Sequence, residues 1–304
     1  MKETLVLCKR NILIFMRDRA SVFFSVLSML IVLMLMVLFL GNMNTDNIVE
    51  LLDQFGGMRD AALDRENAGQ LISMWTLAGV LLVNCVTVPM TVMGNMVTDE
   101  AEGRLAAFYI TPVKRSRIAL GYILASWIIG ALLCLLTLVL GAAYLTACGA
   151  DALKISDYIV LTGMILLNTF LYSAVAYLAA LFVHSASAWS GMLTVIGTLV
   201  GFVGAIYLPV GMLPAKVASV LKVLPVLHGA SMMRRICTED ALAEVFNGLP
   251  AEVAEIYQEN MGITLSVKDQ TISVFTSAGF VVGLSILVTV AAFIVSRYRA
   301  GRDR

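Results

Sequence analysis

The chain alternates between long stretches without any charged residue and short stretches in which the charges are gathered. The uncharged stretches are 20–45, 67–98, 118–150, 158–215 and 271–296. A membrane-spanning helix needs about 20 mostly apolar residues, so four of these stretches hold one span each. The stretch 158–215 is too long for one helix, and His184-Ser185-Ala186-Ser187 predicts a tight turn within it. We therefore predict six spans, at 22–43, 71–96, 118–147, 157–183, 188–208 and 272–296.

The positive charges indicate how these spans are oriented. On one predicted side lie residues 1–21, 97–117, 184–187 and 297–304, and they carry 13 of the 21 Lys and Arg residues. Loops rich in Lys and Arg remain in the cytoplasm, so both termini are predicted to be cytoplasmic. The expected fold is an all-α polytopic membrane protein that forms a single transmembrane domain over residues 1–304.

Two segments outside the spans have patterns of their own. Residues 1–21 place apolar side chains on one helical face, which suits an interfacial helix, although a plain topological anchor explains the basic residues equally well. That face consists of Leu5, Cys8, Ile12, Phe15 and Met16. The outer region 209–271 is apolar at first but is broken by prolines, which predicts re-entrant helices. Residues 238–262 then read as soluble helices, one of them starting at Pro250 and ending at Gly262.

Composition supports a membrane protein without adding a chemical function. Of the 304 residues, 60% are hydrophobic and 14% are charged, against about 25% charged in soluble domains. The net charge of zero gives no argument for a nucleic-acid partner. We find no phosphate-binding loop, no metal-ligand cluster around His184 or His228, and no catalytic arrangement, so we do not expect an enzyme. Cys148 and Cys237 are both predicted on the outer side. A disulfide between them is conceivable, but two unpaired thiols are the simpler expectation.

The densest island of charge lies between the second and third predicted spans, at 97–117. Acids precede a short apolar helix at 105–110, and cations follow it, which suits the dipole of that helix. Pro112 disfavours helix at Thr111 and is expected to end the segment. We interpret the island as a cytoplasmic handle on which a soluble partner pushes; a solvated loop that anchors topology is the alternative. Its charged residues are Asp99, Glu100, Glu102, Arg104, Lys114, Arg115 and Arg117.

Several polar or small residues lie inside the predicted spans. Asn84 and Thr87 fall within the second span, where polar groups usually face protein or a water-filled path. Asn84 is expected either to contact a substrate or to bond a neighbouring helix. In the fifth span, Gly197 and Gly201 form a Gly-x-x-x-Gly pair, which allows helix backbones to approach closely.

The sequence motifs resemble those of the ABC-2 type permeases, the membrane subunits of ATP-driven exporters. The resemblance rests on Glu100-Ala101-Glu102-Gly103-Arg104-Leu105 followed by Thr111-Pro112-Val113-Lys114-Arg115, and more loosely on 224–234. Arg104 departs from this pattern, because the family usually has Thr there. The span pattern extends the resemblance over essentially the whole chain.

The resemblance implies a site, partners and a function. It makes 97–117 a coupling segment that docks on a separate ATP-binding cassette subunit, which would hold ATP and Mg while this chain binds no cofactor. The implied coupling residues are Asp99, Glu100, Glu102, Gly103, Arg104, Leu105, Thr111, Pro112, Lys114 and Arg115. A second permease copy, or a related permease, would complete a path through the lipid bilayer. The implied lining of that path is Asn84, Thr87, Gly197 and Gly201.

The expected function is therefore export across a bacterial cytoplasmic membrane. A path without fixed charge favours an amphiphilic or hydrophobic substrate. A non-transporting membrane sensor or scaffold is the alternative. A secondary transporter is less favoured, because such proteins often carry ionisable groups within their spans.

Overall fold

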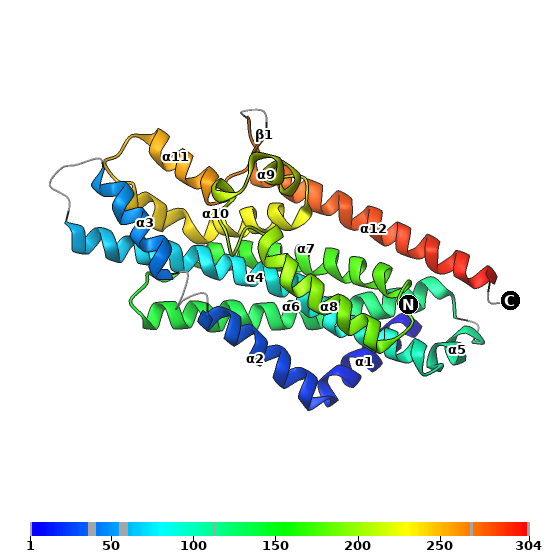
Figure 1. Cartoon of the computed structure of the whole chain (residues 1–304). Helices are drawn as coiled ribbons and strands as arrows, with labels where there is room; N and C mark the ends of the chain where they lie inside the picture. The colour runs from blue at the N-terminus through cyan, green and yellow to red at the C-terminus, as the bar shows by residue number, and fades with distance from the viewer. Residues whose placement is uncertain (1, 36–40, 55–59, 112, 268–269, 303–304) are drawn as a thin grey trace.

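The computed structural model describes residues 2–35, 41–54, 60–111, 113–267 and 270–302. The described chain is a bundle of long helices (Figure 1), and the nearly all-helical fold is confirmed. The first half contains α1 (Lys2–Arg17), α2 (Arg19–Leu35), α3 (Gly41–Asp53), α4 (Ala61–Ala101), α5 (Arg104–Tyr109) and α6 (Arg115–Ala147). The second half contains α7 (Ile155–Ala180), α8 (Ala186–Val203), η2 (Val210–Met212), α9 (Ala215–Leu221), α10 (Pro225–Val245), α11 (Ala251–Asn260), the antiparallel strands β1 (Ser266–Val267) and β2 (Gln270–Thr271), and α12 (Val274–Arg302).

Five helices in the described residues are long and apolar enough to cross a membrane: α4, α6, α7, α8 and the Val274–Tyr298 part of α12. They coincide with the second to sixth predicted spans. The first predicted span, 22–43, begins in α2, but residues 36–40 lie outside the described part. The 17 residues of α2 extend about 26 Å, short of the roughly 30 Å hydrocarbon layer. The count of six spans therefore stays a prediction.

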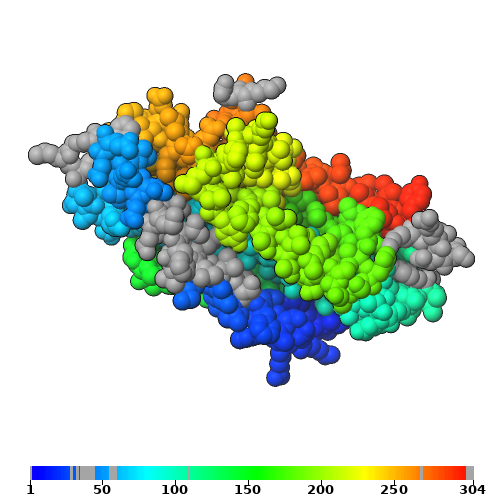
Figure 2. Space-filling view, viewed as in Figure 1, coloured from blue at the N-terminus to red at the C-terminus, as the bar shows by residue number. Residues whose placement is uncertain are grey.

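The core of the bundle is built around α4. Its 41 residues extend about 60 Å, and 89% of its most apolar window is buried, against 17% for α8 and for α12. Helices α6, α7, α8 and α10 all pack on it. Helix α8 instead lies at the surface, as Figure 2 shows. The apolar side chains exposed on α8 and α12 are available to lipid or to another membrane subunit.

The two ends of the bundle differ in character (Figure 1). One end, here called the charged end, holds α1, the last turn of α4, α5, the start of α6 and the turn between α7 and α8. The opposite end holds α3, the start of α4, α11 and the β1–β2 hairpin. The described residues of the four segments predicted to share a side thus lie at one end. Of the predicted turn 184–187, residues 184 and 185 lie between α7 and α8, and residues 186 and 187 already belong to α8. Which end faces the cytoplasm stays a prediction.

The face of α1 that packs on the bundle overlaps only in part with the apolar face read from the sequence. Leu7, Cys8, Asn11 and Phe15 are buried, whereas Leu5 is 61% exposed and Met16 is 55% exposed. The physical reason is a close contact with α6. A β-carbon built at Gly121 would lie 2.8 Å from that of Leu7, so Gly121 lets α1 approach through its Leu7 side.

The region 209–271 contains more continuous helix than its prolines suggested. Helix α10 begins at Pro225, which occupies its first position, where proline is tolerated, and it continues without a break into the soluble helices predicted from residue 238. Helix α11 follows Pro250, and Gly262 adopts a φ of +63° just beyond its end, which confirms the predicted limits of that helix. Residues 44–70, which carry six Asp and Glu residues, overlap with α3 and the start of α4. Re-entry of the region 209–271 into the bilayer stays a prediction.

Candidate functional site

Asp99, in the last turn of α4, is the centre of the charged end. Its side chain is 2% exposed. Arg10 of α1 donates to it through Nη1, at 2.7 Å from Oδ2, and through Nη2, at 3.0 Å from Oδ1. The hydroxyl of Tyr122 from α6 donates at 2.6 Å, and Arg104 Nη1 of α5 lies 3.3 Å from Oδ1. A buried carboxylate is tolerated only when it is paired and hydrogen-bonded, so these four residues, the Asp99 cluster, hold four helices together.

Arg10 is fixed by more than its ion pair. Its guanidinium lies over the ring of Phe108 in α5, 5.2 Å from the centroid, a distance at which a cation–π attraction operates. Nη1 also donates to Asn11 Oδ1 at 3.0 Å. The hydrogen bond to Asp99 raises the pKa of Arg10 above its already high ordinary value, against the opposing effect of desolvation. Arg10 therefore remains a permanent cation between α1, α4 and α5.

Helix α5 has one face held by the bundle and one face free of it. Leu105 is 3% exposed and belongs to an apolar cluster with Leu7, Val97 and Ile118. On the other face, Ala106 and Ala107 are exposed, and Ile110, just beyond the end of the helix, is 88% exposed. The exposed side of this short helix is therefore accessible while Leu105 keeps its contacts with the bundle.

The turns on either side of α5 place the remaining predicted coupling residues. Gly103 adopts a φ of +73° between α4 and α5, a left-handed conformation that other residues adopt only at a cost. Thr111 closes the C-terminal end of α5 by donating from its hydroxyl to the Phe108 carbonyl at 2.6 Å. Lys114 is exposed and precedes the first turn of α6, where Arg115 is half-buried. Pro112 lies outside the described residues.

The turn between α7 and α8 also reaches this segment. His184 Nδ1 lies 3.0 Å from Glu100 Oε1. Arg117, at the start of α6, pairs with Glu3 of α1. Sequence reasoning placed these residues on one side of the membrane but did not pair them. It also missed Arg10, Phe108 and Tyr122, since neither apolar periodicity nor the motif contains a signal for them.

The predicted path residues of α4 line a groove between α2 and α4. The groove has a volume of about 340 Å³, and Asn84 and Thr87 share it with Ser21, Ser25 and Thr91. Asn84 is 3% exposed, and its Nδ2 also lies 3.4 Å from Thr137 Oγ1 of α6. The bond to Thr137 is the contact with a neighbouring helix that was expected as one role of Asn84, and contact with a substrate stays a prediction.

The predicted glycines of α8 lie elsewhere. Gly197 and Gly201 are not among the residues that line the groove. Gly201 lies beneath the ring of Tyr207, and a β-carbon there would come within 2.2 Å of the ring. At Gly197 a β-carbon would meet no other atom within 4 Å. In this chain, Gly201 of α8 allows the Tyr207 ring to pack closely against the helix.

A fully buried cation lies near the opposite end. Arg234 of α10 is 0% exposed and stacks on Trp75 of α4, 4.4 Å from the ring centroid. Its Nη2 donates to the carbonyls of Gly204, at 3.0 Å, and Ala205, at 2.8 Å. Its Nη1 donates to Met261 and Gly262, at 3.4 and 3.3 Å. Burial lowers the pKa of Arg234 to about 9, so the group stays charged at neutral pH and binds the carbonyl ends of α8 and α11.

Other chemistry-bearing residues have structural surroundings. His228 Nε2 donates to the Lys222 carbonyl at 3.0 Å, and Nδ1 lies 3.0 Å from the Ser277 hydroxyl. Desolvation lowers the pKa of His228. Cys148 is exposed, Cys237 is buried, and both are free thiols. Within the described residues, no group of three His, Cys, Asp or Glu side chains is placed to hold a metal ion.

Comparison with known families gives one result that bears on this geometry. The model of the ABC-2 family transporter proteins matches residues 58–295. The match runs from just before α4 to near the end of α12, and so includes Asp99, α5 and the groove side of α4, while α1 and α2 precede it. No curated protein matches the sequence.

Proposed function

The chain belongs to the ABC-2 transporter family, and from that premise we propose that it is the permease subunit of an exporter driven by a separate ATP-binding subunit. The family and the apolar helices make the chain a multi-pass membrane protein and a transporter subunit. We propose three further points: the direction of transport, the segment that docks on the ATP-binding subunit, and the class of substrate.

The observation that carries the proposal is the Asp99 cluster. A motor subunit that pushes on α5 needs a rigid connection to the helices that move. Arg104 and Phe108 connect α5 to Asp99 and Arg10, and through them to α1 and α4, while Tyr122 adds α6. Packed elements of this kind move as rigid bodies, so a displacement of α5 is passed to three further helices at once. The exposed face around Ile110 is the proposed docking surface.

The groove between α2 and α4 is the proposed part of the substrate path in this chain. Its hydroxyl groups already donate within α4, from Thr87 to Val83 and from Thr91 to Thr87, both at 2.9 Å. A hydroxyl that donates can still accept, so the groove offers acceptors beside the apolar Phe24 and Val88. Such a lining suits an amphiphilic molecule with hydrogen-bond donors. A second permease copy or a related permease would close the open side.

Docking is tested by co-purification with the ATP-binding cassette subunit that the same organism provides. We expect Ile110→Asp to abolish association, because it places a charge on the docking face. The matched control is Ile155→Asp, which changes a residue 81% exposed at the start of α7, toward the opposite end. Retention of the subunit by Ile110→Asp would argue against docking on α5.

Transmission is tested separately from docking. We expect Asp99→Asn to retain the ATP-binding subunit while it loses the stimulation of ATP hydrolysis by transported compounds, because the connection to α1 and α6 is weakened. Normal stimulation in Asp99→Asn would mean that the Asp99 cluster does not transmit movement.

A further inference from the structure

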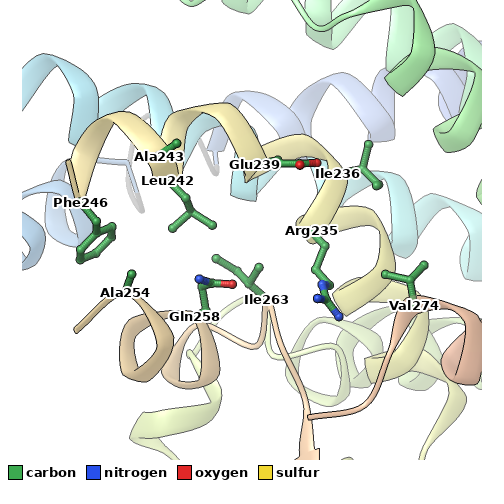
Figure 3. Close-up of a pocket in the computed structure, with 10 residues that line it drawn as sticks. All are labelled: Arg235, Ile236, Glu239, Leu242, Ala243, Phe246, Ala254, Gln258, Ile263 and Val274. Carbon is green, nitrogen blue, oxygen red and sulfur yellow. The ribbon is translucent and has the colours of Figure 1, made fainter. Parts of the chain in front are cut away.

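A cavity of about 530 Å³ lies between α10 and α11 near the opposite end of the molecule (Figure 3). Its volume falls in the range of about 300–1,000 Å³ that is usual for sites of small molecules. It shares no lining residue with the groove between α2 and α4, and it is remote from the Asp99 cluster. The cavity is therefore not explained by the proposed transport path.

One end of the cavity is apolar and preformed. Leu242 and Phe246 line it from α10, and Ala254 lines it from α11. Figure 3 shows Phe246 and Ala254 together at this end. The Phe246 ring packs on Tyr257 with their centroids 5.0 Å apart, which holds the wall in place without a ligand. Such a wall favours a hydrocarbon chain or another apolar group.

The other end carries charge. Arg235 lies there beside Val274, the first residue of α12 (Figure 3). Its Nη1 donates to the Ile272 carbonyl at 3.2 Å, which orients a guanidinium that has five N–H donors in all. Glu239 lines the cavity one helical turn further along α10, and Gln258 faces it from α11. Residues four apart on a helix have β-carbons roughly 6 Å apart, so a cationic and an acidic side chain border the same space.

We propose that this cavity binds a zwitterionic amphiphile. Its anionic group would meet Arg235, its ammonium group would meet Glu239, and its apolar chain would lie along Leu242 and Phe246. A purely apolar ligand would displace water from the half-buried Arg235 guanidinium without offering it a partner, which is unfavourable. A ligand with an anion alone would offer Glu239 no group of opposite charge; within the chain this exposed carboxylate interacts with Lys154.

The position of the cavity along the bundle supports a zwitterionic amphiphile as its ligand. The apolar span of α12 begins at Val274, so the charged end of the cavity lies where the hydrocarbon region gives way to lipid headgroups. Two sources share this chemistry: a bilayer phospholipid, or a single-chain amphiphile that arrives from solution. The inference does not depend on ATP-driven transport.

The test measures binding of fluorescent lysophosphatidylethanolamine to the full chain in nanodiscs of phosphatidylglycerol, a bilayer without zwitterions. Lysophosphatidylglycerol and an alkylamine of equal chain length provide the anion alone and the ammonium alone. We expect saturable binding of the zwitterion, at least about tenfold tighter than of either comparison probe. Each methylene added to the probe should tighten binding by about fourfold until the cavity is filled.

Variants assign the two charges and the cavity. We expect Glu239→Gln to remove the preference for the zwitterion over lysophosphatidylglycerol, and Arg235→Gln to remove its preference over the alkylamine. Glu255→Gln, an exposed change on α11 outside the cavity, should leave Kd unchanged. Ala243→Phe should weaken every probe by obstructing the cavity, whereas Ala251→Phe, which does not line it, should not.

Two results would overturn the proposal. One is uptake of the probe that rises without saturation, as expected of partition into the bilayer. The other is saturable binding that is equal for all three head groups, or unaffected by Ala243→Phe. Nanodiscs that contain phosphatidylethanolamine then identify the source. Weaker probe binding in them assigns the cavity to a bilayer lipid, and unchanged binding assigns it to a soluble amphiphile.

Discussion

Replacement of Asp99 by Asn gives the sharpest test of how the charged end is held together. The change keeps the shape of the side chain and removes its charge. Asp99 is 2% exposed, and Arg10, at 27%, keeps part of its guanidinium in contact with solvent. Because the two residues are 89 positions apart in the chain, their pairing reports on tertiary structure and not on helix propensity.

The expected magnitude follows from the contacts. Asp99 accepts two hydrogen bonds from Arg10, at 2.7 and 3.0 Å, and one from Tyr122 at 2.6 Å. Hydrogen bonds to charged groups contribute about 1.5–3 kcal/mol each, and removal of one partner from a buried pair costs about 3–5 kcal/mol. Since solvent reaches Arg10, we expect the lower end, a loss of about 3 kcal/mol from the free energy of unfolding.

The assay is a double-mutant cycle read by SDS-induced unfolding of the chain in mixed micelles. Asp99→Asn, Arg10→Gln and the double variant should give a coupling energy of about 2 kcal/mol. The control is Asp240→Asn, which disrupts a pair of the same length, 2.7 Å to Lys154, with side chains 58% and 64% exposed. That change should cost less than about 1 kcal/mol.

Two outcomes of the cycle would refute the reasoning. The first is a coupling energy below about 0.5 kcal/mol, which is the level of independent sites. The second is a loss in Asp240→Asn as large as that in Asp99→Asn. Either result would mean that burial does not strengthen the Asp99–Arg10 pair.

Three further predictions concern α8 and the region that follows it. Arg234→Met should lower the free energy of unfolding by about 3 kcal/mol in the same assay, because four carbonyls lose their donor; an unchanged value would show that they find other partners. Gly201→Ala should cost about 1–3 kcal/mol by overpacking against Tyr207, and Tyr207→Ala in the same chain should recover much of it; no recovery would locate the strain elsewhere. The lowered pKa of His228 means that the unfolded chain binds a proton before the folded one does, so stability should fall as pH drops below about 6.5. Between pH 7.5 and 5.5, the melting temperature of a His228→Gln variant should therefore fall less than that of the unchanged chain. The same fall in both would contradict the role of His228.

The bundle itself could be read largely from the sequence. A helix in hydrocarbon must satisfy its backbone hydrogen bonds within its own segment, so a long apolar run implies a helix whatever surrounds it. This is why the second to sixth predicted spans coincide with α4, α6, α7, α8 and α12. Helix α11 was located for a second reason that is also local: Pro250 restricts the backbone where its own helix begins.

Faces and partners were harder to predict. The apolar face read for α1 divides between two surroundings, because Cys8 and Phe15 pack on protein while Leu5 and Met16 are exposed. Lipid and protein are both apolar neighbours, so periodicity does not tell which one a residue meets. Gly121 decides the matter for Leu7, but a glycine 114 positions away gives no signal in the pattern of α1. Gly201 packs against Tyr207 within its own chain, in line with the close approach that the motif allows, and the place on the path that the resemblance implied stays a prediction.

The sequence by itself determined that this protein is a helical membrane protein, which segments share an end of the bundle, and where the charged segment with the family's motif lies. Each of these is a property of a continuous stretch of chain. Only the tertiary structure decided that Asp99 is buried against Arg10 and Tyr122, that Arg234 binds the ends of two helices, and that a cavity separates α10 from α11. Those features depend on which distant residues the packing brings within a few ångströms, and electrostatic and hydrogen-bond energies change steeply over that distance.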